Sequence, residues 1–276
     1  MVQPPPKLGL IAGGGAIPAI ARDTCRAQNR PIYIAALNGF CDPATVAGTE
    51  HDWFDLPQVG RLLKSLKAAG VEEVCLCGRV GKPDFYHLKP DLRGALLLPR
   101  VIKAAATGDD AILRVVVDAF EQDGFRVVGI EQVVASLLAG DRQYGGVKPD
   151  QMQENDIRIG IAAARELGRA DHGQAVIVAG GQVLGREDDA GTDALLARMT
   201  GQKPARGGVL VKTAKPQQDR RVDLPTIGMT TVANAAAAGL AGIAVEAGAA
   251  LMVDAPAMAL ATDRHGMFLV GFGHDR

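Results

Sequence analysis

The chain has 276 residues, of which 47% are hydrophobic and 22% charged, and its formal net charge is -1 at pH 7. This balance is typical of a folded globular protein, and the near-zero charge excludes a general nucleic-acid binder, which carries a basic excess. No apolar run reaches the ~18 residues that a membrane-spanning helix needs. The length suits two domains, and the start, MVQPPPKLGL, lacks the features of a secretory signal, so we expect a cytoplasmic protein.

The first half of the chain alternates strand and helix signals. The apolar runs KLGLIAG, PIYIAAL and VEEVCLCG are separated by helical spacing from about residue 16 to 28 and from 58 to 69. A further helix is expected from Asp109 to about Gln122, with Asp109 and Asp110 suiting the helix dipole, and FRVVGI is expected to be the last strand. This alternation predicts a parallel sheet with helices on its faces, a Rossmann-like α/β domain.

Two glycine turns follow strands of this domain. At the carboxyl end of a parallel strand, such turns expose backbone N–H groups that bind phosphates. The first turn resembles a dinucleotide fingerprint, but Pro18 stands at its sixth place, and PIYIAAL runs into Asn38 where a NAD site has an acid. We therefore expect a nucleotide or phosphate cradle, while a purely structural turn and a NAD site stay open as alternatives. The glycines expected to bind substrate are Gly13, Gly14, Gly15 and Gly78.

The four cysteines and five histidines form no recognisable metal or nucleophile motif. The cysteines, all within the first 77 residues, lack paired CxxC spacing, and the chain has no HExxH, no GxSxG and no Walker loop. We interpret the thiols as buried structural residues and expect no metal bound through histidine or cysteine.

A polar, glycine-rich segment, AGDRQYGGVKPDQ, follows Leu138 and predicts a connector between two cores. The expected domains are 1–138, the Rossmann-like domain, and 139–276, an α/β domain with a charged catalytic loop. A long helix, QENDIRIGIAAARELGRA, opens the second half. Strands and helices then alternate from QAVIVAGGQVLG to MFLVGF, with helices at 192–199 and after Thr230, which predicts a second sheet.

The segment KTAKPQQDRRVDLPTIG, residues 212–228, is the strongest candidate for chemistry. It follows the apolar strand GGVLV and combines cations and carboxylates with two prolines that stiffen a loop. Lysine and arginine suit phosphate oxygens, and carboxylates can hold Mg²⁺ or orient a water against a phosphorus atom. A surface loop of ion pairs is the alternative. The nearby GTDALLARM opens a helix and offers a second terminus that favours anions.

Residue types within these two segments predict separate roles. The expected catalytic residues are Asp223, Arg221 and Lys215. The expected substrate-binding residues outside the glycine turns are Thr192, Asp193, Lys212, Gln218, Asp219 and Thr226. Asp219 and Asp223 are the candidate metal ligands, because a carboxylate in a stiff charged loop can bind Mg²⁺ or activate water.

Several strings, in order along nearly the whole chain, resemble one known family. LIAGGGAIP, GDDAILR, GTDALLAR and VLVKTAKPQQDRRVDLPTIG, followed by AAAAGLAGIAVEAG, are similar to the LpxI-type UDP-2,3-diacylglucosamine pyrophosphatases of lipid A biosynthesis. The resemblance implies a Mg²⁺-dependent hydrolase of the Gram-negative cytoplasm that splits UDP-2,3-diacylglucosamine into UMP and 2,3-diacylglucosamine 1-phosphate (lipid X), with water attacking the β-phosphorus. It also implies a lipid-binding cleft between two α/β domains, a homodimer, and contact with the cytoplasmic face of the inner membrane.

Two functions of other classes stay open beside this one. The chain could be a dinucleotide-dependent oxidoreductase or a nonenzymatic nucleotide-sugar-binding protein. The charged segment discriminates among them, because an oxidoreductase has no use for it and a binding protein needs its cations but not Asp223.

Overall fold

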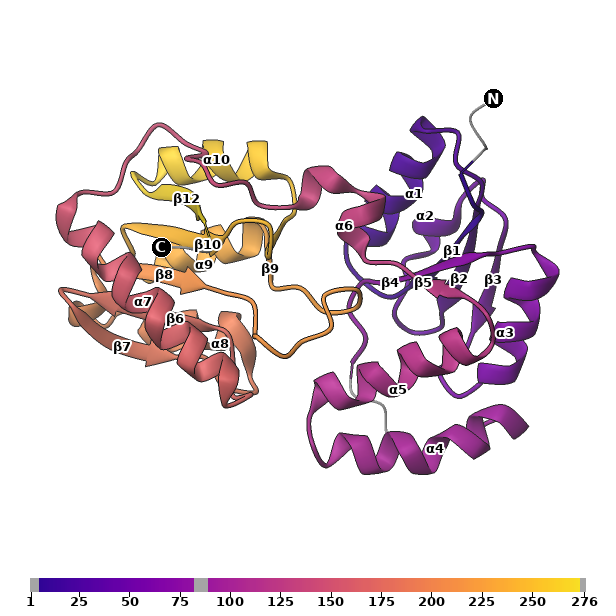
Figure 1. The fold of residues 1–276 in the computed structure, drawn as a ribbon. Helices are drawn as coiled ribbons and strands as arrows, with labels where there is room; N and C mark the ends of the chain where they lie inside the picture. Colours follow the sequence, from indigo (N-terminus) through magenta and orange to yellow (C-terminus); the bar gives the residue numbers. More distant parts are fainter. Residues whose placement is uncertain (1–4, 82–88, 274–276) are drawn as a thin grey trace. The chain divides into compact units, whose positions relative to one another are not determined.

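The computed structural model describes residues 5–81 and 89–273 and divides the chain into two compact units (Figure 1). Unit 1 comprises Met1–Ala135 and Asp219–Asp223, and unit 2 comprises Ser136–Gln218 and Leu224–Arg276. Each unit has its own sheet covered by helices, which confirms the prediction of two α/β domains. Residues 219–223, expected in the second domain, group with unit 1.

In the described residues, unit 1 is built on five parallel strands in the order β3-β2-β1-β4-β5. The strands are β1 (Leu8–Ala12), β2 (Ile32–Leu37), β3 (His51–Phe54), β4 (Glu73–Cys77) and β5 (Arg126–Val127). The helices are α1 (Ile17–Ala27), α2 (Pro43–Val46), α3 (Val59–Ala68), α4 (Leu92–Ala105), α5 (Asp109–Gln122) and α6 (Ile130–Val133), with a 3₁₀ turn, η1 (Ala135–Leu137), after them. This is the Rossmann strand order. From β1 the chain adds strands first on one side, β2 and β3, and then on the other, β4 and β5, and such sheets bind ligands at the point between β1 and β4 where this change occurs.

Unit 1 has apolar side chains on both faces of its sheet, because successive strand residues point to opposite sides. One face packs Ile11, Tyr33 and Val74 against Leu66 of α3 and Phe120 of α5. Helices α1, α3 and α5 agree with the predicted ranges. The run FRVVGI differs from its predicted extent, because only two residues form β5 before the chain turns into α6.

The sheet of unit 2, within the described part of the chain, has the order β12-β10-β8-β6-β7. Its strands are β6 (Ala175–Ala179), β7 (Gln182–Arg186), β8 (Val209–Lys212), β10 (Gly242–Glu246) and β12 (Phe268–Phe272), and a separate pair is formed by β9 (Thr226–Ile227) and β11 (Leu251–Met252). The helical elements are α7 (Gln151–Arg169), α8 (Gly191–Met199), η2 (Lys203–Ala205), α9 (Met229–Ala237) and α10 (Ala255–Arg264). Strands β8, β10 and β12 are parallel, whereas β6 runs antiparallel to β8 and β7.

The β8 strand shows why unit 2 has two cores. Leu210 belongs to the core that includes side chains of α8, α9 and α10, whereas Val209 and Val211 belong to the core that includes side chains of α7. The run QAVIVAGGQVLG folds as a hairpin of β6 and β7, with Gly180 and Gly181 at positive φ in the turn. None of the described helices is both long and apolar enough to cross a membrane.

The segment expected to be a connector is bonded to unit 2. The N–H of Ala139 donates to the Ala250 carbonyl at 2.8 Å, and the N–H of Tyr144 donates to the Leu269 carbonyl at 2.9 Å. Residues 139–144 therefore run as an extended edge of unit 2, held by backbone hydrogen bonds, rather than as a free linker.

Candidate functional site

The glycine turn of unit 1 joins the carboxyl ends of β1 and β4, at the topological switch point of the sheet. The Gly13 N–H donates to the Cys77 carbonyl at 2.9 Å, and Gly14 and Arg79 exchange two backbone hydrogen bonds of 2.8 Å. A Cβ on Gly13 would lie 2.6 Å from the Arg79 carbonyl oxygen, so only glycine fits this close approach. The N–H groups of Gly13 and Gly14 are therefore engaged by the protein itself.

Gly15 is the exposed member of the turn. It has a φ of +91°, and a Cβ built on it would meet no heavy atom within 4 Å. Helix α1 starts two residues later, and Pro18 is buried in its first turn. Proline is tolerated there because the N–H that it lacks would have no partner within the helix. A Cβ on Gly78, whose φ is +90°, would lie 2.9 Å from Pro18 Cγ. The structure thus brings the four predicted glycines together, with Gly15 and Gly78 exposed to solvent.

Lys212, the last residue of β8, is buried and holds a short polar chain. Its Nζ donates to the Thr192 hydroxyl at 2.8 Å, and that hydroxyl donates to Glu187 Oε1 at 2.5 Å. The other Glu187 oxygen accepts the Gln174 N–H at 2.7 Å. A buried ammonium and a buried carboxylate need such hydrogen-bonded partners, because an uncompensated charge is costly to desolvate.

Charged residues gather at one edge of the unit 2 sheet. Strands β7, β8 and β10 point the same way, and Glu187, Lys212 and Glu246 stand at or just after their carboxyl ends. The buried Glu246 accepts the Ala214 N–H at 3.0 Å and pairs with Arg165 at 3.2 Å. Sequence reasoning missed both glutamates, although each follows an apolar strand, in VLGRE and GIAVE.

The stretch 215–218 is anchored to the end of α7. Lys215 Nζ pairs with Asp171 Oδ1 at 2.7 Å, and the Lys215 N–H donates to Gln218 Oε1 at 2.8 Å. Gln217 donates to the Gly168 carbonyl at 2.7 Å. Of the two predicted residues here, Lys215 has a side chain that is 15% exposed and pairs with Asp171, whereas Gln218 is buried and shapes the loop.

Residues 219–223 form a tight turn that belongs to unit 1. Arg221 donates through Nε and Nη2 to the Asp219 carboxylate, at 2.9 and 2.6 Å, and through Nη1 to Glu121 Oε1 at 2.6 Å. Val222 packs against the core of unit 1, and the Asp223 N–H donates to the Asp219 carbonyl at 3.0 Å. The hydrogen bond from Arg221 lowers the pKa of Asp219, which keeps this carboxylate charged.

Two further predicted residues lie near the start of α8 and in β9. The Thr226 carbonyl oxygen lies 3.5 Å from Lys212 Nζ, which places Thr226 beside the chain of Lys212 and Thr192. Asp193, in the first turn of α8, accepts a hydrogen bond of 3.0 Å from Asn234 of α9. Thr192 therefore belongs to the polar cluster at the sheet edge, whereas Asp193 links two helices.

Metal-binding side chains are sparse. The described part of the chain holds no group of three or more His, Cys, Asp and Glu residues that could bind a metal ion. Cys25, Cys41 and Cys75 are buried as predicted, and burial raises the pKa of the Cys25 and Cys41 thiols. The carboxylates of the charged loop are thus the candidate ligands for a hard cation.

The chain folds as two α/β units, the first with Rossmann strand order, and the segment 212–228 carries residue types that bind phosphates. These features define a two-domain α/β protein with a candidate anion-handling loop. The chain belongs to the LpxI family, as its motifs predict: residues 7–137 match the family model of the LpxI N-terminal domain, and residues 141–270 match that of the LpxI C-terminal domain.

A curated relative supports the same family. The chain is 43% identical over 272 residues to the UDP-2,3-diacylglucosamine pyrophosphatase LpxI of Caulobacter vibrioides, covering 96% of this chain and 97% of that protein. A comparison with solved structures gives a match to one described as "Crystal structure of gox2253". The match covers 98% of this chain and 78% of the chain in that structure, with 12% sequence identity and a TM-score of 0.31. A likeness that low carries no argument about fold or function.

Proposed function

We propose that this protein hydrolyses the pyrophosphate bond of UDP-2,3-diacylglucosamine and releases UMP and 2,3-diacylglucosamine 1-phosphate. The support is its place in the LpxI family and its 43% identity, over nearly the full length of both chains, to a protein of that name. The observation that carries the proposal is the turn Asp219–Asp223, in which Arg221 is held by the Asp219 carboxylate and the backbone N–H of Asp223 donates to the Asp219 carbonyl.

Within this turn the two carboxylates take different roles. Arg221 holds Asp219 in place through three of its N–H groups, so we assign Asp219 to positioning Arg221. We assign the chemical role to Asp223, which is half-buried on the same turn. A carboxylate in that place can accept the proton of an attacking water.

The proposed step is an in-line displacement. The water oxygen bonds to the β-phosphorus while the bond between that phosphorus and the bridging oxygen breaks, and UMP leaves with the bridging oxygen and its electron pair. The water proton passes to the Asp223 carboxylate. Arg221 of the same turn stabilises negative charge on the phosphate oxygens, and we assign the uridine side of the substrate to the glycine turn at Gly15 of the same unit. Lys212 and Lys215 of unit 2 stay predicted phosphate-binding residues.

Mg²⁺ is part of the proposal. This ion binds through one or two carboxylates together with substrate phosphate oxygens, and Asp223 fits that description. Asp219 fits less well, because Arg221 donates hydrogen bonds to both of its carboxylate oxygens. When bound, the ion would neutralise charge on the phosphate oxygens. A cytoplasmic location, a homodimer and contact with the membrane surface complete the proposal.

An oxidoreductase is disfavoured by the end of β2. A NAD site needs an acid there to hold the ribose, and this chain has Asn38, whose amide donates to Asp55 Oδ1 at 2.9 Å. A nonenzymatic nucleotide-sugar-binding protein is the second candidate, because buried cations such as Lys212 serve binding as well as turnover.

The test is hydrolysis in ¹⁸O-labelled water. We expect the wild-type protein with Mg²⁺ to release UMP and to place the heavy oxygen in 2,3-diacylglucosamine 1-phosphate; label in UMP would show attack on the α-phosphorus instead. Asp223→Asn is expected to abolish turnover but keep substrate binding, while Asp189→Asn, an exposed acid, keeps full activity. Binding without any UMP from the wild type would favour the nonenzymatic candidate.

A further inference from the structure

Helix α4 of unit 1 exposes a group of large apolar side chains. Leu92 is 82% exposed, Leu96 70% and Ile102 50%. The other exposed large hydrophobic residues of the described chain lie singly in four separate segments: Val80, Met152, Met229 and Leu260. Single exposed apolar side chains are ordinary, but a group on one helix marks an interaction surface.

The spacing places these side chains on one side of the helix. Leu92, Leu96 and Pro99 follow each other at intervals of four and three residues, and Ile102 comes three residues later, which makes one helical stripe. Gly94 and Ala104, on the opposite side, are buried, and α4 packs there against α5 and α3. The apolar stripe is therefore the outer face of α4.

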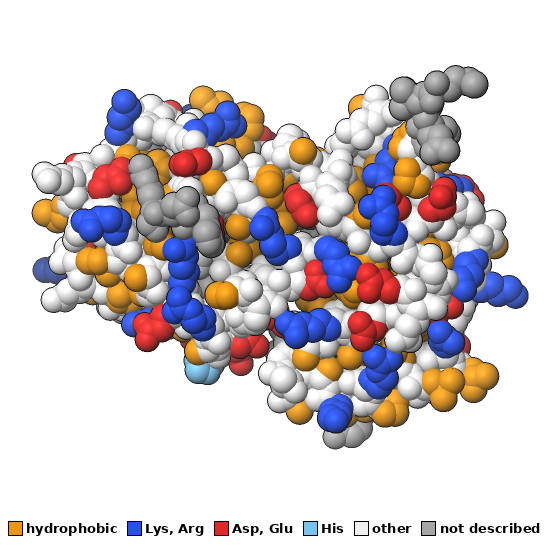
Figure 2. Space-filling view, in the orientation of Figure 1, with side chains coloured by type: hydrophobic (Ala, Val, Ile, Leu, Met, Phe, Trp, Pro, Cys, Tyr) orange, Lys and Arg blue, Asp and Glu red, His pale blue; other side chains and the backbone are white. Residues whose placement is uncertain are grey.

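Basic residues border this stripe, and acidic ones are missing from it. From Leu92 to Ala105 the helix carries Arg93, Arg100 and Lys103 and no Asp or Glu. Arg93 and Arg100 reach Asp123 and Asp118 at 2.6 and 3.2 Å, yet their side chains stay about half exposed. Figure 2 shows hydrophobic and basic side chains together over α4.

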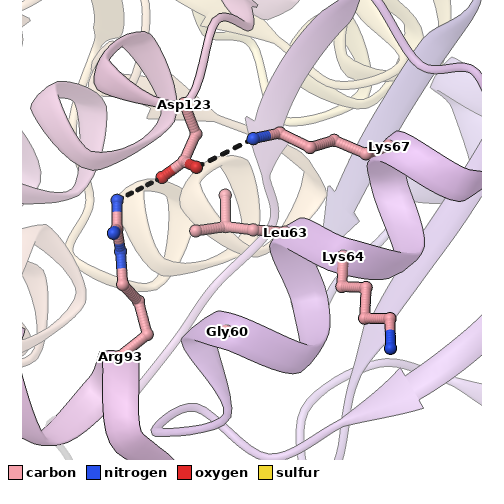
Figure 3. Close-up of a pocket in the computed structure, with 6 residues that line it drawn as sticks. All are labelled: Gly60, Leu63, Lys64, Lys67, Arg93 and Asp123. Atoms are coloured by element: carbon pink, nitrogen blue, oxygen red, sulfur yellow. Dashed lines mark hydrogen bonds and ion pairs between the residues drawn. The ribbon is translucent and has the colours of Figure 1, made fainter.

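A pocket of about 280 Å³ lies beside α4 and adds to this basic character (Figure 3). Its polar lining consists of Lys64 and Lys67 of α3, Arg93 of α4 and the carboxylate of Asp123. Asp123 bridges Lys67 at 2.9 Å and Arg93 at 2.6 Å, while Lys64 extends away from this bridge. Three cations against one carboxylate leave the pocket suited to an anionic group.

We propose that the basic apolar surface, made of the outer face of α4 and the pocket of Lys64, Lys67 and Arg93, docks unit 1 on an anionic lipid bilayer. Apolar side chains enter the boundary between headgroups and acyl chains, and the cations meet lipid phosphates. Charge complementarity selects this occupant: a second copy presenting the same face would bring cations against cations. The inference rests on the membrane contact in the proposed function and names the face that makes it; it does not depend on the hydrolysis step.

The test is sedimentation of the full-length protein with vesicles, without substrate. We expect the wild type to sediment with vesicles that contain phosphatidylglycerol and not with pure phosphatidylcholine. Leu92→Ser/Leu96→Ser should weaken partition at least about tenfold, whereas Leu260→Ser, an exposed leucine of α10, should not change it. Thermal unfolding of each variant checks that the fold is kept.

Charge reversal provides a second, independent variant. Lys64→Glu/Lys103→Glu should weaken binding to the anionic vesicles by a similar factor and reduce its dependence on salt. Lys148→Glu/Lys203→Glu makes the same change in net charge on exposed residues of unit 2 and should leave most of the binding. Equal losses in both pairs would overturn the proposal, since net charge alone would then explain the effect.

Two further outcomes contradict the proposal. Equal sedimentation of the wild type with both vesicle types would remove the role of the cations. If Leu92→Ser/Leu96→Ser instead converts a dimer to a monomer and leaves vesicle binding intact, the face lies between two copies. Release of UMP from substrate dispersed in detergent is measured separately, so failure of the reaction leaves this result standing.

Discussion

Asp219 and Arg221 make the best-defined ion pair of the charged loop, and its effect depends on pH. The pair depresses the pKa of Asp219 in the folded state below its ordinary value of 3.8. A depressed pKa contributes stability above the ordinary value, and that stability is lost as the pH falls through the folded-state pKa.

We therefore expect Asp219→Asn to lose less stability than the wild type on acidification below about pH 4. The measurement is urea unfolding at a series of pH values. Because Arg221 is partly exposed, solvent screens the pair and the difference is small at neutral pH. The same acid dependence in both proteins would show that the pair does not persist in solution.

A second prediction concerns the close approach at the glycine turn. Gly13→Ala places a Cβ 2.6 Å from the Arg79 carbonyl oxygen, so we expect the free energy of unfolding to fall by about 1 to 3 kcal/mol. Gly146→Ala is the matched control, because its Cβ would meet only ordinary contacts, the nearest at 3.7 Å. Equal stability of Gly13→Ala and the wild type in urea would contradict the packing described for β1 and β4.

At the scale of elements, the β6–β7 hairpin depends on a side chain from another element. Asp156 of α7 is 1% exposed and accepts the N–H groups of Gly180 and Gly181 at 3.0 and 2.7 Å. We expect Asp156→Ala to lower the free energy of unfolding by about 2 to 4 kcal/mol, since two N–H groups lose a charged acceptor. Hydrogen exchange at both glycines should accelerate.

The helix cap at Asp150 offers the comparison for that experiment. Its side chain accepts the Gln153 N–H in a capping box, so Asp150→Ala should cost about 1 kcal/mol and leave exchange in the hairpin unchanged. Unaltered exchange at Gly180 in Asp156→Ala would show that the turn is held by its backbone alone.

Helices and strands whose apolar residues repeat at a regular spacing were predictable from the sequence. Elements in which apolar and polar residues follow no regular spacing were not. Helices α3, α5 and α7 have one buried stripe and lie where spacing predicts them. Helix α4 was missed because Gly94 and Pro99 interrupt it and leucines stand on both its buried and exposed sides. Strand β3 was missed because its His51 and Asp52 are exposed at the edge of the sheet.

The candidate site was predictable only where it is local in sequence. Asp219, Arg221 and Asp223 share one string, so residue types alone pointed to them. Glu246 and Glu121 come from distant segments, and their approach to the loop depends on which strands are neighbours and on the path of residues 219–223. The spacing of apolar residues and the composition of the chain carry no information about the order of the strands or the path of residues 219–223.

At the scale of the whole molecule, a residue late in the sequence stabilises the first unit. Val222 packs against the core that contains Phe120 and Leu66, so we expect Val222→Ser to accelerate hydrogen exchange in β4 and β5. Val147→Ser is the matched control, because Val147 packs against a core of unit 2 and should affect exchange there. Faster exchange confined to unit 2 in Val222→Ser would contradict this assignment.

The path of residues 219–223 also has a genetic consequence. Because these five residues belong to unit 1, neither unit corresponds to one continuous stretch of the gene. A recombination between relatives at any point from 136 to 218 would give the first unit of one parent a loop from the other, pairing Arg221 with a foreign partner in place of Glu121. Chimeras that exchange the first unit should therefore carry residues 219–223 from the same parent, in two separate DNA segments.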